Sequence, residues 1–231
     1  MHLLSDDLLQ RSTVVANNTM NRQRKLVGVN SYEKEIGFQI SDYLLNRCQL
    51  EESVFWLDLC CGEGNAPIQL ARSLQGKPEA EQIHIVGLDL VGMFSDFAQV
   101  DHPTLSLVET DFESWQTTQK FDLITCIHGL HYIGDKLGAI QKIASLLKPD
   151  GRFVGNLSFE NLLDEAGNLL KKPLLNDWKT LGWSYRPRRR LLEIPGNTAY
   201  SPNFTYLGAD DQAGPNYTGQ PVVHSIYLQI N

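Results

Sequence analysis

Short apolar runs alternate with amphipathic segments through the middle of the chain, from residue 54 to residue 158. Runs rich in β-branched and aromatic residues predict buried strands, and apolar residues at helical spacing predict helices that pack on them. Alternation of such units predicts a parallel sheet with helices on both faces. The expected strands are Val54–Leu59, Gln82–Leu90, Leu105–Val108, Lys120–Ile127 and Arg152–Leu157, and the expected helices are a segment after Gly64 that reaches Leu74, a weak one at Val91–Gln99, and Lys136–Leu147.

The two flanks of this core follow other patterns. Residues 1–30 are polar and predict a mobile arm, whereas Ser31–Gln49 carries one apolar face and predicts a helix capped by Ser31. Beyond Ser158 we expect a short helix, then irregular chain around the tryptophans, an antiparallel strand pair at the sheet edge, a turn-rich loop and a last strand. These segments are Asn161–Leu170, Trp178 and Trp183, Arg188–Ile194 with Asn203–Leu207, Gly208–Gly219, and Val222–Ile230.

Composition limits the classes of function. The 231 residues fit one domain, and the net charge of −7 disfavours a nucleic-acid partner or an anionic membrane surface. No apolar run is long enough to span a bilayer, and the N-terminus is acidic where a signal peptide would be basic. The four cysteines form no C-x-x-C pair and no ligand spacing with histidines, which predicts reduced thiols, no metal site and a cytoplasmic protein.

Acidic residues follow three successive predicted strands. Asp58, or Glu63 in the following turn, comes first, then Asp89, then Asp111. Ligands of such sheets lie outside the carboxyl ends of the strands, where these acids would meet. An acid after the second strand can accept hydrogen bonds from two ribose hydroxyls, and an acid after the third can accept one from an adenine amino group. Carboxylates there would repel the phosphates of a dinucleotide. The pattern predicts a nucleoside ligand with a cationic tail; the alternative for each acid is a helix cap or turn former.

At this point the sequence resembles a known family, the class I S-adenosylmethionine-dependent methyltransferases, over about residues 54–158. The resemblance implies a three-layer αβα Rossmann-like sandwich, with a mostly parallel seven-stranded sheet and an antiparallel edge strand. Five segments in the family's order carry it: Asp58-Leu-Cys-Cys-Gly62-Glu-Gly64, Val86-Gly-Leu-Asp89-Leu90, Glu109-Thr-Asp111-Phe112, Phe121 to Tyr132, and Leu147-Lys-Pro-Asp-Gly-Arg-Phe153.

The resemblance implies one domain, 1–231. Residues 1–50 would be an arm and a capping helix, 51–158 the donor-binding core, and 159–231 the sheet edge and the acceptor side. S-adenosyl-L-methionine is the implied cofactor, with S-adenosyl-L-homocysteine as its product. The implied cofactor-binding residues are Tyr32, Asp58, Cys60, Gly62, Gly64, Asn65, Asp89, Leu90, Asp111, Phe112, Ile127 and His128.

One departure from the family pattern is Cys60, which stands where the family has its first glycine. A small residue is tolerated at that turn, so we expect a changed backbone approach but retained donor binding. A dinucleotide-binding dehydrogenase would need a third glycine where Pro67 stands. Pro67 instead suits the first turn of a helix, so the dehydrogenase interpretation fails.

His128, His131 and Tyr32 are the candidate catalytic residues, because an acceptor that loses a proton needs a base near the methyl group. For His131 the alternative is a packed core histidine. We expect a small-molecule acceptor in secondary metabolism, methylated by in-line transfer, and a monomer or homodimer. The acceptor atom stays open among oxygen, nitrogen and carbon. The alternatives are a methyltransferase that modifies RNA or protein, and a catalytically inactive protein that only binds the donor.

Overall fold

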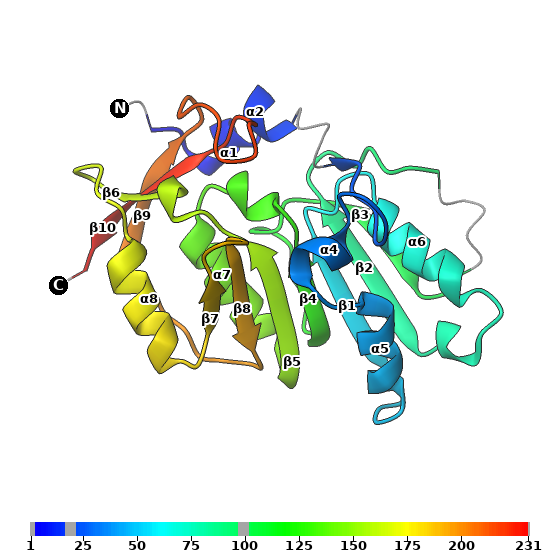
Figure 1. Ribbon diagram of the computed structural model, residues 1–231. Coiled ribbons are helices and arrows are strands. Elements are labelled where there is room, and N and C mark those ends of the chain that lie inside the picture. The colour runs from blue at the N-terminus through cyan, green and yellow to red at the C-terminus, as the bar shows by residue number, and fades with distance from the viewer. Residues whose placement is uncertain (1–2, 17–21, 97–101, 231) are drawn as a thin grey trace.

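The computed structural model describes residues 3–16, 22–96 and 102–230. Its centre is a seven-stranded sheet with the strand order β3-β2-β1-β4-β5-β8-β7 (Figure 1). Strands β1 to β5 pair in parallel, and β8 runs antiparallel to both β5 and β7. The predicted seven-stranded, mostly parallel sheet with antiparallel pairing at one edge is confirmed. The strands are β1 Val54–Leu59, β2 Ile83–Asp89, β3 Leu105–Glu109, β4 Phe121–Cys126, β5 Leu147–Asn156, β7 Ser184–Arg186 and β8 Leu191–Pro195.

Helices cover both faces of this sheet, as the alternating pattern predicts. Helices α4 (Tyr32–Ile36), α5 (Ile40–Cys48) and α6 (Asn65–Leu74) pack on one face, and α7 (Lys136–Leu146) and α8 (Lys171–Thr180) belong to the core on the other. Strands buried on both faces need apolar side chains in both directions. Neighbouring residues Trp56 and Leu57 of β1 accordingly belong to the two different core clusters.

The N-terminal flank differs from its prediction in two ways. The expected helix Ser31–Gln49 is two helices, because Gly37 adopts the left-handed conformation that ends α4. The Ser31 cap is confirmed, since its side chain accepts a hydrogen bond from the Lys34 N–H. The arm contains α1 (Asp6–Leu9) and α2 (Thr13–Ala16), and Leu9 and Leu26 are both buried. Part of the arm is therefore core, contrary to the expectation from its polarity.

The C-terminal flank differs more. The expected helix Asn161–Leu170 contains β6 (Leu162–Asp164), and Trp178 lies in α8 instead of irregular chain. The expected pairing of Arg188–Ile194 with Asn203–Leu207 is wrong, because β8 pairs with β5 and β7. A separate three-stranded sheet has the order β6-β10-β9, with β9 at Phe204–Asp210 and β10 at His224–Gln229. Alternation identifies a strand but not its partner, which tertiary packing selects.

Two further observations concern helices. Residues 91–96 of the weakly predicted helix Val91–Gln99 are not helical, and 97–99 lie outside the described residues. Within the described ranges, none of the helices has the length and apolarity that crossing a bilayer demands.

Candidate functional site

A cleft opens at the carboxyl ends of the central strands. The arm helices α1 and α2 lie over this edge of the sheet (Figure 1). The arm contributes Asp6, Leu9, Val15 and Arg22 to its walls. This is the edge of the sheet where the sequence places the ligand site. The predicted site residues that line the cleft are Cys60, Asp89, Leu90, Asp111, Phe112, Ile127 and His128. Tyr32, Asp58, Gly62, Gly64, Asn65 and His131 are not among its lining residues.

The turn between β1 and α6 joins the cleft to the end of β2. Cys60, Gly62 and Gly64 all have positive φ, and Gly64 is the residue from which α6 starts. The N–H of Gly62 donates to Asp89 Oδ2 at 2.9 Å. Cys60 has φ 55°, a conformation that is strained for a residue with a side chain and is often found at functional sites.

Asp89 ends β2 and is nearly buried, at 7% exposure. Its Oδ2 accepts from Gly62, while its Oδ1 accepts from the Val91 N–H at 3.1 Å and from Arg22 Nη1 at 2.7 Å. The acid expected to bind ribose therefore lies in the cleft with an arginine of the arm beside it.

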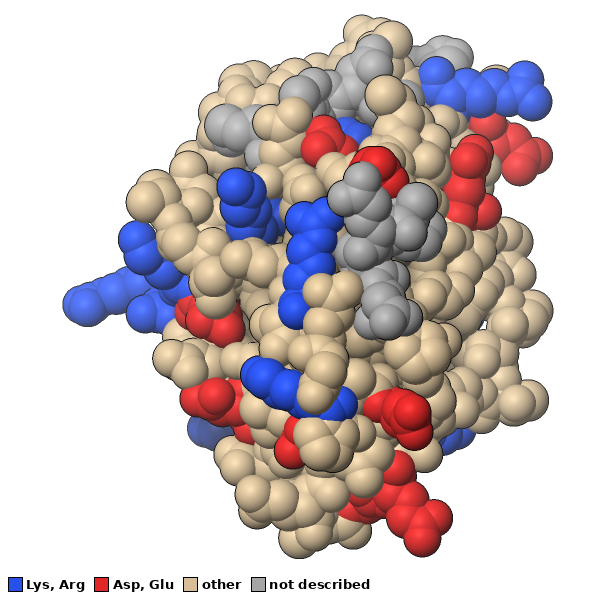
Figure 2. Space-filling model, turned by 90° about the vertical axis from the view of Figure 1, so that its right-hand side faces the viewer, with Lys and Arg blue, Asp and Glu red and all other residues tan. Residues whose placement is uncertain are grey.

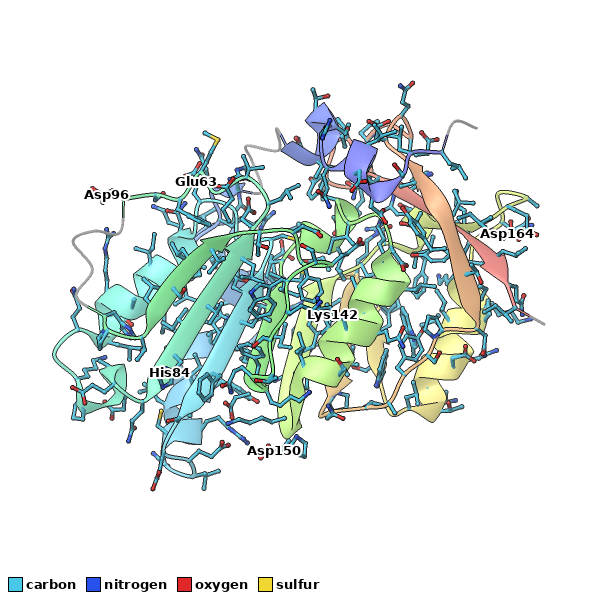
Figure 3. All side chains as sticks on the ribbon, turned by 180° about the vertical axis from the view of Figure 1, so that it is seen from behind. Glu63, His84, Asp96, Lys142, Asp150 and Asp164 are labelled. Atoms are coloured by element: carbon cyan, nitrogen blue, oxygen red, sulfur yellow. The ribbon has the colours of Figure 1, made fainter. Side chains whose placement is uncertain are left out.

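Asp111 lines the cleft and also caps the turn after β3. Its two carboxylate oxygens accept from the N–H groups of Glu113 and Ser114 at 3.2 and 2.9 Å. The turn-capping interpretation of this acid is confirmed, and its contact with the donor stays a prediction. Figure 3 shows Lys142 on α7, and its Nζ donates to the carbonyls of Phe112 and Glu113 at 2.7 and 3.0 Å. Lys142 therefore fixes the segment that carries Asp111.

Asp58 and Tyr32 form a buried pair outside the cleft. Asp58 accepts from the Tyr32 hydroxyl at 3.0 Å and from Thr125 Oγ1 at 2.7 Å. Burial raises the pKa of Asp58 to about 7, while these two hydrogen bonds lower it. Tyr32, expected to bind the cofactor and to be a candidate base, is only 2% exposed and connects α4 to the end of β1 through Asp58. Asn65, also expected at the donor, accepts at Oδ1 from Ser95 Oγ at 3.0 Å.

His128 follows β4 and has φ 62°, the second strained non-glycine residue of the cleft. Its Nε2 lies 3.2 Å from Glu35 Oε1, and its Nδ1 lies 3.4 Å from the Tyr217 hydroxyl. The hydrogen bond from His128 is the main reason that the pKa of Glu35 is lowered. An ionised Glu35 only accepts, so the proton of the neutral imidazole is on Nε2 and Nδ1 is left as an acceptor.

His131 is fully buried one helical turn beyond His128. Its Nε2 lies 3.2 Å from the same Tyr217 hydroxyl, and its Nδ1 has no hydrogen-bond partner in the described part of the chain. Burial lowers the pKa of His128 and lowers that of His131 further. The Arg190 guanidinium lies over the Tyr217 ring, 3.9 Å from its centroid. The two histidines therefore share one phenol, which covers them.

Sequence reasoning missed Glu35 and Arg22 as site residues. Glu35 lies 93 residues from His128 in the sequence, and nothing in its local pattern separates it from Glu33. Arg22 belongs to a basic run that looks like a solvated arm. Only contacts between distant segments bring Arg22 to the cleft and Glu35 to His128.

Comparisons with known proteins agree with this geometry. The sequence model of the methyltransferase domain family (Methyltransf_23) matches residues 33–194. A demethylmenaquinone methyltransferase of Lactiplantibacillus plantarum is 30% identical over 115 residues, 42% of this chain and 42% of that protein. The arginine-hydroxylase NDUFAF5 of Mus musculus is 29% identical over 124 residues, 53% of this chain and 34% of that protein. The chain thus spans less than half the length of these curated relatives.

A solved structure of YjhP from E. coli aligns with a TM-score of 0.45 and 17% identity, covering 76% of this chain and 71% of that chain. A likeness at this level adds nothing to the assignment. The family model extends over most of the chain and contains β1 to β5, the glycine turn, Asp89, Asp111 and His128. The chain therefore belongs to the class I S-adenosylmethionine-dependent methyltransferase family.

Proposed function

We propose that this protein transfers a methyl group from S-adenosylmethionine to a small-molecule acceptor, with His128 as the base that takes the acceptor's proton. The observation that carries the proposal is the position of His128, which lines the donor cleft while Glu35 holds its Nε2. A base must lie near the reacting atoms in a defined orientation, and the cleft position and the Glu35 contact of His128 both support that role. The placement in secondary metabolism stays a prediction.

The residues of the cleft support donor binding. Apolar side chains and a few polar groups line it together, as in most sites that bind small molecules. Asp89 would accept from the ribose hydroxyls and Asp111 from the adenine amino group, and the positive-φ turn allows close approach of the backbone. When bound, S-adenosylmethionine supplies an electrophilic methyl group on sulfur.

The residues on the acceptor side would bind, orient and deprotonate. The lowered pKa of His128 keeps its imidazole neutral near pH 7, so Nδ1 is available to accept a proton. The adjacent Glu35 carboxylate would stabilise the imidazolium that this transfer creates. Tyr217 stands beside Nδ1, where an acceptor group would have to come.

Enclosure and charge favour a small acceptor over a macromolecule. His128 and His131 are 2% and 0% exposed, which favours an acceptor small enough to enter the cleft over a residue of a folded protein or an RNA. On the face shown in Figure 2, acidic and basic side chains are interspersed, unlike the basic stripe typical of RNA-binding surfaces. One relative is named an arginine-hydroxylase, so a reaction other than methyl transfer on this fold is the alternative.

The first test is donor binding by isothermal titration with S-adenosylhomocysteine. Asp89→Ala leaves the ribose hydroxyls without their acceptor, so binding should weaken by about 1–3 kcal/mol. Glu165→Ala, an exposed acid far along the chain, is the matched control. The donor assignment of Asp89 fails if the two variants bind equally well.

The second test is release of S-adenosylhomocysteine from S-adenosylmethionine in the presence of phenols, amines, carboxylic acids, RNA or protein. Turnover with a small molecule supports the proposal. Turnover only with RNA or protein would contradict the proposal and indicate a methyltransferase that modifies a macromolecule. Donor binding without turnover in any class would identify a protein that binds the donor but does not catalyse transfer.

A further inference from the structure

Arg22 occupies the part of the cleft where the donor's ribose is expected. Its Nη1 lies 2.7 Å from Asp89 Oδ1, and the two side chains are only 13% and 8% exposed. An ion pair this shielded from water is screened little by salt. The arm therefore places a cation directly on the acid that the donor needs.

The main chain of Arg22 lies against the glycine turn as well. Its carbonyl accepts from the Glu63 N–H at 2.9 Å. A Cβ on Gly62 would fall 2.4 Å from the Arg22 Cα, a separation at which atoms clash. Gly62 thus permits a close approach of the arm to the same turn that is expected to approach the donor.

The hydrogen bonds at Asp89 leave little room for a ribose. Oδ2 accepts from Gly62, and Oδ1 accepts from both Val91 and Arg22. Each carboxylate oxygen has about two acceptor positions, so both positions of Oδ1 are used. Two ribose hydroxyls could bond to Asp89 only if the arginine leaves it.

The contact is also incomplete in a way that makes it displaceable. Arg22 Nη2 is buried and has no hydrogen-bond partner within the described ranges, so the guanidinium pairs with Asp89 through one nitrogen only. A bidentate pair would be stronger and more rigid. Ligand hydroxyls therefore compete against a single charged hydrogen bond.

We propose that Arg22 is a self-blocking residue of the donor site: its guanidinium and the donor's ribose exclude each other at Asp89. Only those molecules in which Arg22 has left Asp89 can then bind the donor. If the blocked form outnumbers the open form by about ten to one, the apparent affinity for the donor is about tenfold weaker than the intrinsic affinity. The inference rests on the proposed ribose contact of Asp89, and it does not depend on the acceptor.

The test is titration with S-adenosylhomocysteine and with adenosine, which shares the ribose but lacks the amino-acid tail. Arg22→Met should tighten binding of both ligands by about tenfold, because the competing charge is gone. Arg22→Gln also removes the charge, so it should tighten binding of both ligands too. The unfolding temperature of this variant shows whether the fold is intact. Lys25→Met removes an exposed cation from the same arm and should leave both affinities unchanged.

A double-mutant cycle makes the outcome decisive. In an Asp89→Ala background the gain from Arg22→Met should vanish, since both act through one contact. Weaker binding of S-adenosylhomocysteine by Arg22→Met would overturn the proposal and make Arg22 a ligand of the donor. Unchanged affinities, or a gain that persists without Asp89, would overturn it too. Acceptor methylation can fail or succeed in the assays above without altering any of these results.

Discussion

At the scale of single residues, Cys60 and His128 bear backbone strain beside the same cleft. Their φ angles of 55° and 62° fall in a region that residues with side chains seldom occupy. The strain at His128 is compensated by specific bonds: its N–H donates to Asn156 Oδ1 at 3.2 Å, and its ring contacts Glu35. Strain retained this way is typical of positions where function sets the geometry.

The first prediction concerns the pH dependence of turnover through His128. Burial holds the pKa of His128 below 6.5, so the neutral base persists at lower pH than for an exposed histidine. Turnover should be flat above pH 6.5 and fall only as the pH drops through the lowered pKa. Rates measured between pH 5 and 8 at saturating donor give the position of this acid limb.

Two variants check that assignment. His128→Ala should lower turnover by roughly 10²–10⁴-fold, the usual share of acid–base catalysis, while the donor affinity hardly changes. Glu35→Gln removes the carboxylate charge that favours the imidazolium, so the acid limb should move to still lower pH. Normal turnover in the His128→Ala variant would mean that His128 lines the cleft but is not the base.

At the scale of elements, the loop between β9 and β10 acts as a cover for the histidines. An isolated bridge between Pro215 and Pro221 closes the loop, and Tyr217 projects from it onto His128 and His131. The Arg190 guanidinium packs over the Tyr217 ring. The Tyr217 side chain therefore covers both buried imidazoles from the side of this loop.

The second prediction concerns this cover. Tyr217→Ala should expose the imidazoles, so diethylpyrocarbonate should modify His128 and His131 faster than in the wild type, as located by peptide mass spectrometry. Tyr217→Phe keeps the ring and removes only the hydroxyl, so it should modify nearly as slowly as the wild type. Equal rates in all three proteins would mean that other residues protect the histidines.

At the scale of the whole molecule, the small sheet is built into the core of the large one. Tyr227 of β10 and Phe204 of β9 belong to the same core cluster as α7 and β4. The buried Lys136 Nζ donates to the Ile133 and Val223 carbonyls and to Ser225 Oγ, at 2.8, 2.9 and 2.8 Å. The start of α7 is thereby bound to β10 and to the segment before it.

The third prediction follows from this shared core. The protein should unfold in one cooperative calorimetric transition, as a single domain does. Lys136→Met removes the lysine donor from three oxygens, of which those of Val223 and Ser225 form buried bonds, and should lower stability by roughly 2 kcal/mol or more. Lys171→Met, at an exposed site on α8, should change stability little. Two separate transitions in the wild type would contradict the single domain.

Local signals were enough to predict the donor half of the fold. β1 to β5, the glycine turn and the helix starting at Asn65 follow from hydrophobic period and turn chemistry, which neighbouring residues set. Parallel strands bring their carboxyl ends to one edge, so the acids at 89 and 111 could be placed in one cleft from sequence order alone.

Tertiary structure decided what those residues touch. Asp58 points away from the cleft, because a buried carboxylate needs hydrogen-bond donors. Its donors are Tyr32 of α4 and Thr125 of β4. Arg22 reached Asp89 across 67 residues, and Glu35 reached His128 across 93. The strands β9 and β10 pair with each other outside the large sheet, because β8 occupies the hydrogen-bonding edge of β5. A periodic sequence defines an element's faces, whereas its partner depends on which distant segments compete for the same hydrogen bonds and apolar surface.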